Sequence, residues 1–252
     1  MPLELVGWKA QFDAHGALCQ VRRPDGVVLA DAQHHLGCLR YQTYGARAYE
    51  TFISAYNPLL ATTRNWAIPD FGKPGLETVC TDGATFLPTC VAMHRHADGY
   101  AVRLDLVFNP AAQEQFGCPR RWQLTLRATT ETLTWELRWQ DKNATRVPEA
   151  LWLGFHPVIA GAPRLMLSKW GQEIDATTVI AGGNQRLHHG DVVCWHDDAV
   201  SWRMDLPEGG LVAPGGGAQV QFDQEKPRPC PGFRPQPAQH HLGHKFLQVV
   251  RR

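Results

Sequence analysis

Hydrophobic and polar residues alternate along the middle of the chain with the period of two that marks half-buried β-strands. The pattern is clearest over residues 100–108, 122–128 and 133–139. The apolar positions of these segments are Tyr100, Val102, Leu104, Leu106, Phe108, Trp122, Leu124, Leu126, Leu133, Trp135, Leu137 and Trp139. We expect the set from Trp122 to Trp139 to lie buried on one sheet face, because alternation allows a single inward register. The polar link Thr129–Thr132 predicts a β-hairpin between the last two segments.

Helical periodicity is weak, and only Glu4–Ala14, Glu50–Leu60 and Ala111–Phe116 are compatible with short helical turns. The 23 glycines and 18 prolines interrupt the chain at the short intervals that many strands joined by turns require. The sequence therefore predicts a single all-β domain of sandwich type over residues 1–224, with antiparallel sheets and long loops. After about Glu225 the chain is rich in Pro, Arg, His and Gln without alternation, which predicts an irregular tail over residues 225–252.

Composition excludes several classes of protein. The 252 residues are 44% hydrophobic, enough for a sizeable core, and the net charge of +1 gives no support for binding nucleic acid or a membrane surface. No apolar run approaches the roughly 18 residues of a membrane helix, and the start lacks the pattern of a signal peptide. We therefore expect a soluble, cytoplasmic protein. Its seven cysteines include no C-x-x-C pair, so we expect free thiols, no metal site and no cofactor.

A loop rich in Gly and Pro, Asn65–Gly75, combines Trp66, Asp70 and Lys73. An aromatic ring can stack on the apolar face of a sugar while charged groups bind its hydroxyls, so this set is a candidate sugar-binding surface. The alternative is structural, with Asp70 and Lys73 satisfying backbone groups of an ordered loop.

Histidines and carboxylates offer further candidates. His156 follows an apolar strand, where it is either a core residue or a general acid facing a cleft. Glu173 and Asp175 share one strand face but cannot flank a substrate from both sides, which favours a binding or structural role over glycosidic cleavage. Arg186 and His188 follow in the same region. The chain has no G-x-S-x-G, P-loop or G-x-G-x-x-G motif, which argues against a triad hydrolase, an NTPase or a dinucleotide-binding enzyme.

Four segments in order along the chain carry a resemblance to a known family: Trp66–Gly75, Pro148–Pro157, Lys169–Gly190 and Leu211–Gly216. From about Gly16 to about Asp223, the chain resembles an uncharacterised C-terminal β-sandwich region of proteins related to glycoside hydrolase family 38, the α-mannosidase type. The resemblance implies a galactose-mutarotase-like β-sandwich, or supersandwich, a fold shared by sugar epimerases and accessory domains of glycosidases. Because one fold serves many functions, it implies a carbohydrate-related role and no particular reaction.

Three interpretations of function follow from the resemblance. In the first, the domain is not catalytic alone and binds carbohydrate or packs against a glycosidase barrel through a surface formed by Trp66, Asp70, Lys73, His156, Arg186 and His188. In the second, it is a free-standing aldose mutarotase or epimerase, with His156 as general acid and Glu149 or Glu173 as the carboxylate base. In the third, it is a purely structural interaction domain. The oligomeric state is left open by all three.

The tail departs from relatives of this kind, which end with a segment similar to N-L-x-N-N-x-W-G-T-N-F followed by a Trp. Codons can be chosen for Gly232–Arg252 that, one nucleotide later, spell NLHN and GTNF at that spacing. We hypothesise that a single-nucleotide frameshift replaced the last strands with the present tail. A sandwich that loses a paired strand exposes an unpaired sheet edge.

Overall fold

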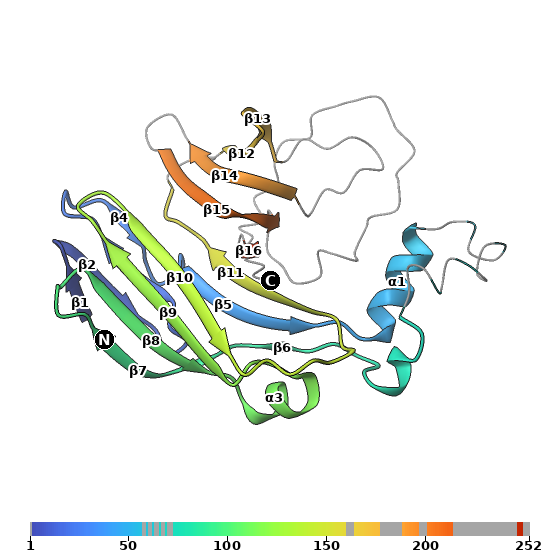
Figure 1. The fold of residues 1–252 in the computed structure, drawn as a ribbon. Helices are drawn as coiled ribbons and strands as arrows, with labels where there is room; N and C mark the ends of the chain where they lie inside the picture. Colours follow the sequence, from blue (N-terminus) through green and yellow to red (C-terminus); the bar gives the residue numbers. More distant parts are fainter. Residues whose placement is uncertain are drawn as a thin grey trace. The chain divides into compact units, whose positions relative to one another are not determined.

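The computed structural model describes residues 2–56, 59, 62, 66, 69, 73–159, 164–176, 188–196, 201–213 and 246–248. Strands dominate these residues, and the strand pairs within each part of the chain are antiparallel, which confirms the predicted all-β sandwich class (Figure 1). The chain divides into two compact units, where the sequence predicted one domain. Unit 1 is Met1–Thr43 with Ala84–Ile159, and unit 2 is Tyr44–Gly83 with Ala160–Arg252. None of the helices in these described ranges has the length and apolar character that crossing a bilayer requires.

Unit 1 is built from two antiparallel sheets. One sheet has the strand order β1-β2-β3-β5-β11, with β4 beside β3 and β6 beside β5, and the other has the order β10-β9-β8-β7. The strands of the first sheet are β1 Pro2–Leu5, β2 Trp8–Phe12, β3 Leu18–Arg22, β4 Val28–Ala30, β5 Leu36–Thr43, β6 Thr85–Phe86 and β11 Glu149–Phe155. Those of the second are β7 Thr89–Arg95, β8 Ala101–Val107, β9 Arg121–Ala128 and β10 Leu133–Gln140.

The β9–β10 hairpin has the register that the alternation predicted. Trp135 pairs with Leu126 and Trp139 pairs with Trp122, so all of the inward set lies on one face. Trp122, Leu124, Leu126 and Leu137 are buried, while Leu133, Trp135 and Trp139 are partly exposed. Tyr100, expected to point inward with the β8 residues, is 54% exposed because β8 begins only at Ala101 and Tyr100 belongs to the preceding turn.

The expected helical turns have mixed outcomes. Helix α3, Pro110–Phe116, forms where it was expected, and the Asn109 side chain accepts a hydrogen bond from the backbone N–H of Ala112 at its start. Helix α1, Ala46–Tyr56, overlaps the second expected turn. The turn expected over Glu4–Ala14 is wrong. That segment forms most of the β1–β2 hairpin, because Leu3, Leu5, Trp8, Ala10 and Phe12 alternate inward.

The two sheets of unit 1 pack face to face through large side chains. The Trp135 ring on β10 meets the Phe155 ring on β11 edge-on, with centroids 5.0 Å apart. Trp135 also lies over Gly37 on β5, where an added Cβ would stand 2.6 Å from the indole nitrogen. Gly37 has φ +72°, and the β5–β11 register shifts at the same level, between Gly154 and Phe155. The sheet therefore carries a glycine bulge here, of the kind that redirects the residues beside it.

Unit 2 contains α1, a short 3₁₀ helix at Leu76–Thr78, and a sheet of the order β16-β15-β14-β12-β13. Its strands are β12 Arg164–Lys169, β13 Gln172–Asp175, β14 His188–His196, β15 Ser201–Ala213 and β16 Phe246–Gln248. Leu165, Leu167, Val193 and Trp195 are buried in this unit. Within the tail that was expected to be irregular, β16 pairs with β15, and the other residues from 225 onward lie outside the described ranges.

Candidate functional site

The candidate site lies in unit 1, where β5 begins and β11 ends. His156 is the first residue after β11, and its backbone N–H donates to the carbonyl of His35, 2.9 Å away. The bulge at Gly37 is two residues from His35, so it redirects the backbone where His35 precedes β5 and where His156 follows β11. His156 was singled out from the sequence, while His34 and His35, which it meets in the fold, were not.

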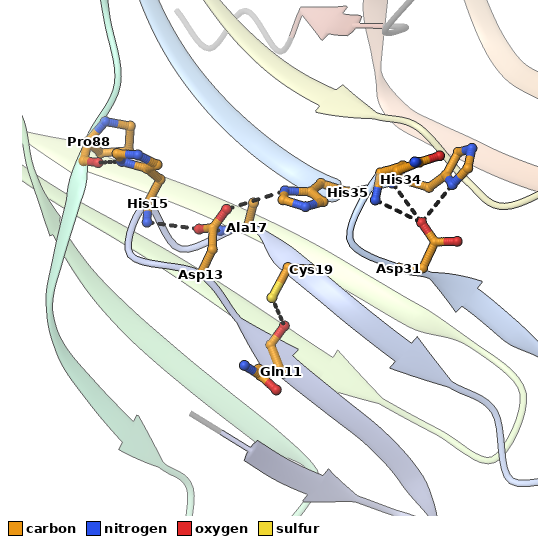
Figure 2. Close-up of polar contacts among 10 residues, drawn as sticks. Gln11, Asp13, His15, Ala17, Cys19, Asp31, His34, His35 and Pro88 are labelled. Atoms are coloured by element: carbon orange, nitrogen blue, oxygen red, sulfur yellow. Dashed lines mark hydrogen bonds and ion pairs between the residues drawn. The ribbon is translucent and has the colours of Figure 1, made fainter. Parts of the chain in front are cut away.

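Asp31 holds His34 through a short hydrogen-bonded turn (Figure 2). Oδ1 of Asp31 lies 2.7 Å from Nδ1 of His34 and also accepts the backbone N–H groups of Gln33 and His34, each at 2.9 Å. The bond from the His34 side chain, followed by the Gln33 N–H, lowers the pKa of Asp31 below its usual value. Because an ionised carboxylate only accepts hydrogen bonds, this contact places a proton on Nδ1 of His34 and turns Nε2 away from Asp31.

The ring of His34 packs against that of His156, with centroids 4.5 Å apart and the planes tilted by 53°. Both side chains are partly exposed. Two imidazoles in contact, one of them oriented by a carboxylate, are an arrangement of the kind that general acid–base chemistry uses.

A second carboxylate–histidine pair lies beside the first (Figure 2). Oδ2 of Asp13 is 3.4 Å from Nδ1 of His35, and Oδ1 of Asp13 accepts the backbone N–H groups of His15 and Ala17. The turn after β2 therefore orients Asp13, and Asp13 in turn orients His35. Among the described residues, no three His, Cys, Asp or Glu side chains converge as metal ligands.

The cysteine beside the bulge is not activated as a nucleophile. Cys38 follows the bulge, and burial raises the pKa of its thiol to about 12. The thiol is therefore protonated at neutral pH and is a poor nucleophile.

Asp31 also lines an open depression of about 830 Å³ on unit 1, which we call the basin. Its lining residues are Pro2, Leu3, Glu4, Lys9, Ala10, Gln11, Gln20, Val21, Arg22, Val28, Ala30, Asp31 and Arg95. Cross-strand pairing sets the polar ones in two rows, Glu4–Lys9–Arg22 and Gln11–Gln20. The alternate residues Ala10 and Val21 are buried. The solvent face of β1–β3 therefore presents amides and charged groups in register.

Glu149, one of the two carboxylates considered as a base, is engaged in a structural contact. Its Oε1 lies 2.9 Å from Nζ of Lys142, and its Oε2 accepts a hydrogen bond from the hydroxyl of Tyr41. Tyr41 is buried, and burial, reinforced by Glu149, raises the pKa of its hydroxyl. Both carboxylate oxygens of Glu149 thus stabilise the start of β11.

The other predicted site residues belong to unit 2. Trp66 is 50% exposed, and Lys73 and Glu173 are exposed, the last on β13. His188 begins β14, opposite Val212 on β15. Asp70 and Arg186 lie outside the described residues. Since His156 belongs to unit 1, the convergence of these residues with His156 stays a prediction.

Only local spacing in the sequence could have indicated the missed residues Asp31, His34 and His35. Asp31 stands three residues before His34, the spacing at which a side-chain carboxylate can cap a turn and reach the following ring. The adjacent pair His34-His35 could be noticed in the sequence, but its proximity to His156 depends on β5 and β11, which are distant in the chain and pair only in the fold.

A family model matches residues 2–134, about half of the chain, and the chain belongs to that family, described as a domain of unknown function, DUF5054. The match includes the basin and both Asp–His pairs, and it ends before His156. None of the curated proteins compared with the chain matches it.

Proposed function

We propose that this member of the DUF5054 family is a carbohydrate-binding β-sandwich domain whose sugar site is the basin of unit 1. The basin itself carries the proposal. Its volume of about 830 Å³ lies within the roughly 300–1,000 Å³ typical of small-ligand sites. Seven of its thirteen lining residues carry amide, ammonium, guanidinium or carboxylate groups, which hydrogen-bond to the hydroxyls of a polyol, and the other six are apolar.

The charge of the basin favours a neutral ligand. Its lining includes the cations Lys9, Arg22 and Arg95 and the anions Glu4 and Asp31, so the two signs of charge are nearly balanced. A site for phosphate or a polyanionic glycan would concentrate one sign of charge. The Gln11–Gln20 pair adds planar groups that both donate and accept, which suits neighbouring hydroxyls of one sugar ring.

The resemblance to the region found in relatives of glycoside hydrolase family 38 agrees with this proposal. The resemblance extends the proposal to a galactose-mutarotase-like sandwich that works beside a glycosidase barrel, in the same chain or in another.

A glycan array probed with the full chain, followed by calorimetry on the best ligand, tests sugar binding. Gln20→Ala and Lys9→Ala should each weaken binding by about 1 kcal/mol, roughly fivefold, the size of one hydrogen bond. The matched control is Gln140→Ala, an exposed glutamine on β10 outside the basin, which should bind as the native protein does. If no glycan binds, the proposal fails and a structural interaction role gains.

A second candidate, an aldose mutarotase, is favoured by the contact between His156 and the Asp31-oriented His34. Ring opening needs an acid to protonate the ring oxygen and a base to remove the proton of the anomeric hydroxyl. The bond between the anomeric carbon and ring oxygen then breaks to give the open-chain aldehyde, and closure on the other face reverses both transfers. His156 would donate the first proton, and Nε2 of His34, whose Nδ1 is held by Asp31, would accept the second.

Polarimetry on freshly dissolved α-glucose and α-galactose tests this second candidate. The native protein should accelerate the approach to equilibrium, and His156→Gln should abolish the acceleration while leaving glycan affinity in the basin unchanged. A rate equal to that of buffer would exclude the mutarotase.

A further inference from the structure

Trp170 is the most exposed large hydrophobic side chain among the described residues. It is 96% exposed, compared with 65% or less for the others. It stands at the tip of the β12–β13 hairpin in unit 2, between Lys169 and Gly171. A tryptophan ring that is exposed at a hairpin tip buries no apolar area and so does not stabilise the fold. Its exposure therefore points to contact with a ligand.

The backbone at this tip is also unusual. Trp170 and Gly171 form a two-residue turn with φ values of +50° and +78°. Turns of this shape favour Asn-Gly, because a bulky side chain is disfavoured at positive φ. A tryptophan here therefore stands where folding alone would favour asparagine, and an outlier of this kind motivates a functional hypothesis.

The neighbours of Trp170 are polar. Lys169 pairs with Gln172 directly below the turn, and Ser168 pairs with Glu173 on the adjacent step. Gln172 and Glu173 are both exposed. The residues that flank this aromatic ring along the hairpin thus carry an amide, a carboxylate and an ammonium group, with Gln172 and Glu173 on opposite faces of β13.

This composition favours a sugar over a protein surface as the ligand. Protein interfaces cluster several apolar anchors around a tryptophan, whereas the exposed residues beside Trp170 are hydrogen-bonding groups. The electron-rich face of an indole attracts polarised C–H groups, and a pyranose presents such a face bordered by hydroxyls. Amide and carboxylate groups bind those hydroxyls.

We propose that Trp170 is a second carbohydrate-binding site of this protein, at which the indole stacks on the apolar face of a pyranose while Gln172, which pairs with Lys169 at the base of the turn, binds the ring hydroxyls. The inference rests on the proposed function and extends it to a residue in unit 2. Glu173, which sequence analysis considered as a catalytic carboxylate, lies on the opposite face of β13 from Gln172 and is not part of this contact.

The test replaces Trp170 with asparagine. Trp170→Asn removes the ring but installs the residue that the turn favours, so the melting temperature should be equal to or above that of the native protein. Binding of a soluble gluco-oligosaccharide or manno-oligosaccharide should weaken about tenfold or more, as expected for removal of a tryptophan anchor. Trp170→Phe should recover part of the affinity, because it retains an aromatic face. Tyr100→Ser, at another exposed aromatic, should change nothing.

Fluorescence gives an independent measurement. The difference in emission between the native protein and Trp170→Phe isolates Trp170, which acrylamide should quench strongly when no ligand is bound. Either oligosaccharide should protect this signal. If Trp170→Asn binds both sugars as the native protein does, or if phosphatidylcholine vesicles protect Trp170 and the sugars do not, the inference is overturned.

The basin variant separates this inference from the proposed function. Loss of affinity in Gln20→Ala but not in Trp170→Asn overturns only the Trp170 site. Loss in Trp170→Asn but not in Gln20→Ala supports the Trp170 site and overturns the basin. Absence of binding by the native chain overturns both.

Discussion

Replacing Gly37 with alanine should destabilise unit 1 through two separable effects. The first is conformational, because φ at Gly37 is +72° and an L-residue there costs about 1–2 kcal/mol. The second is steric, because the new Cβ would stand 2.6 Å from Nε1 and 3.1 Å from Cδ1 of Trp135. Overpacking of this kind costs about 1–3 kcal/mol. Together they predict a loss of about 2–5 kcal/mol.

Gly99 provides the matched control. Its φ is +74°, and an added Cβ meets nothing within 4 Å. Gly99→Ala should therefore cost only the conformational part, about 1–2 kcal/mol. The difference between the two variants measures the clash with Trp135.

A double-mutant cycle isolates the same contact. Trp135→Ala alone should cost about 3 kcal/mol, the low end for tryptophan because the ring is only partly buried. In that background Gly37→Ala should lose its steric cost. The loss in free energy of unfolding of the double variant should therefore be about 1–3 kcal/mol smaller than the summed losses of the two single variants. Urea unfolding followed by far-UV circular dichroism measures all four free energies. Additivity within about 0.5 kcal/mol would refute the packing of Trp135 over Gly37.

Three other predictions concern particular residues. Because its folded pKa is lowered, ionised Asp31 contributes stability that is present above its usual pKa, about 3.9, and is lost as pH falls through the folded value. The free energy of unfolding, measured as a function of pH in the acid range, should therefore fall less steeply in Asp31→Asn than in the native protein. Equal pH slopes in the two proteins would contradict this prediction. Asn109→Ala removes the cap of α3 and should cost about 1 kcal/mol in urea unfolding, whereas an unchanged midpoint would exclude the cap. In the coding DNA, the frame one nucleotide later should encode GTNF opposite Gly243–Phe246, and its absence would end the frameshift hypothesis.

Local chemistry allowed the sequence to predict much of unit 1. Alternation over β9 and β10 predicted the inward face of the hairpin, because a strand side chain's direction depends only on its own position. Alternation failed at Tyr100, where a turn replaces the strand. The helical turn expected over Glu4–Ala14 is wrong, because Val6 and Gly7, both at positive φ, form a tight turn between β1 and β2.

The candidate site was only partly predictable. The sequence by itself determined that His156 follows an apolar strand and that Trp170 precedes a glycine. Only the tertiary structure decided that β11 pairs with β5, which brings His156 against His34, and that the β12–β13 hairpin turns at Trp170 and exposes its ring. The physical reason is that pairing of distant strands and solvent exposure depend on the whole sheet, whereas propensity and alternation are properties of neighbouring residues.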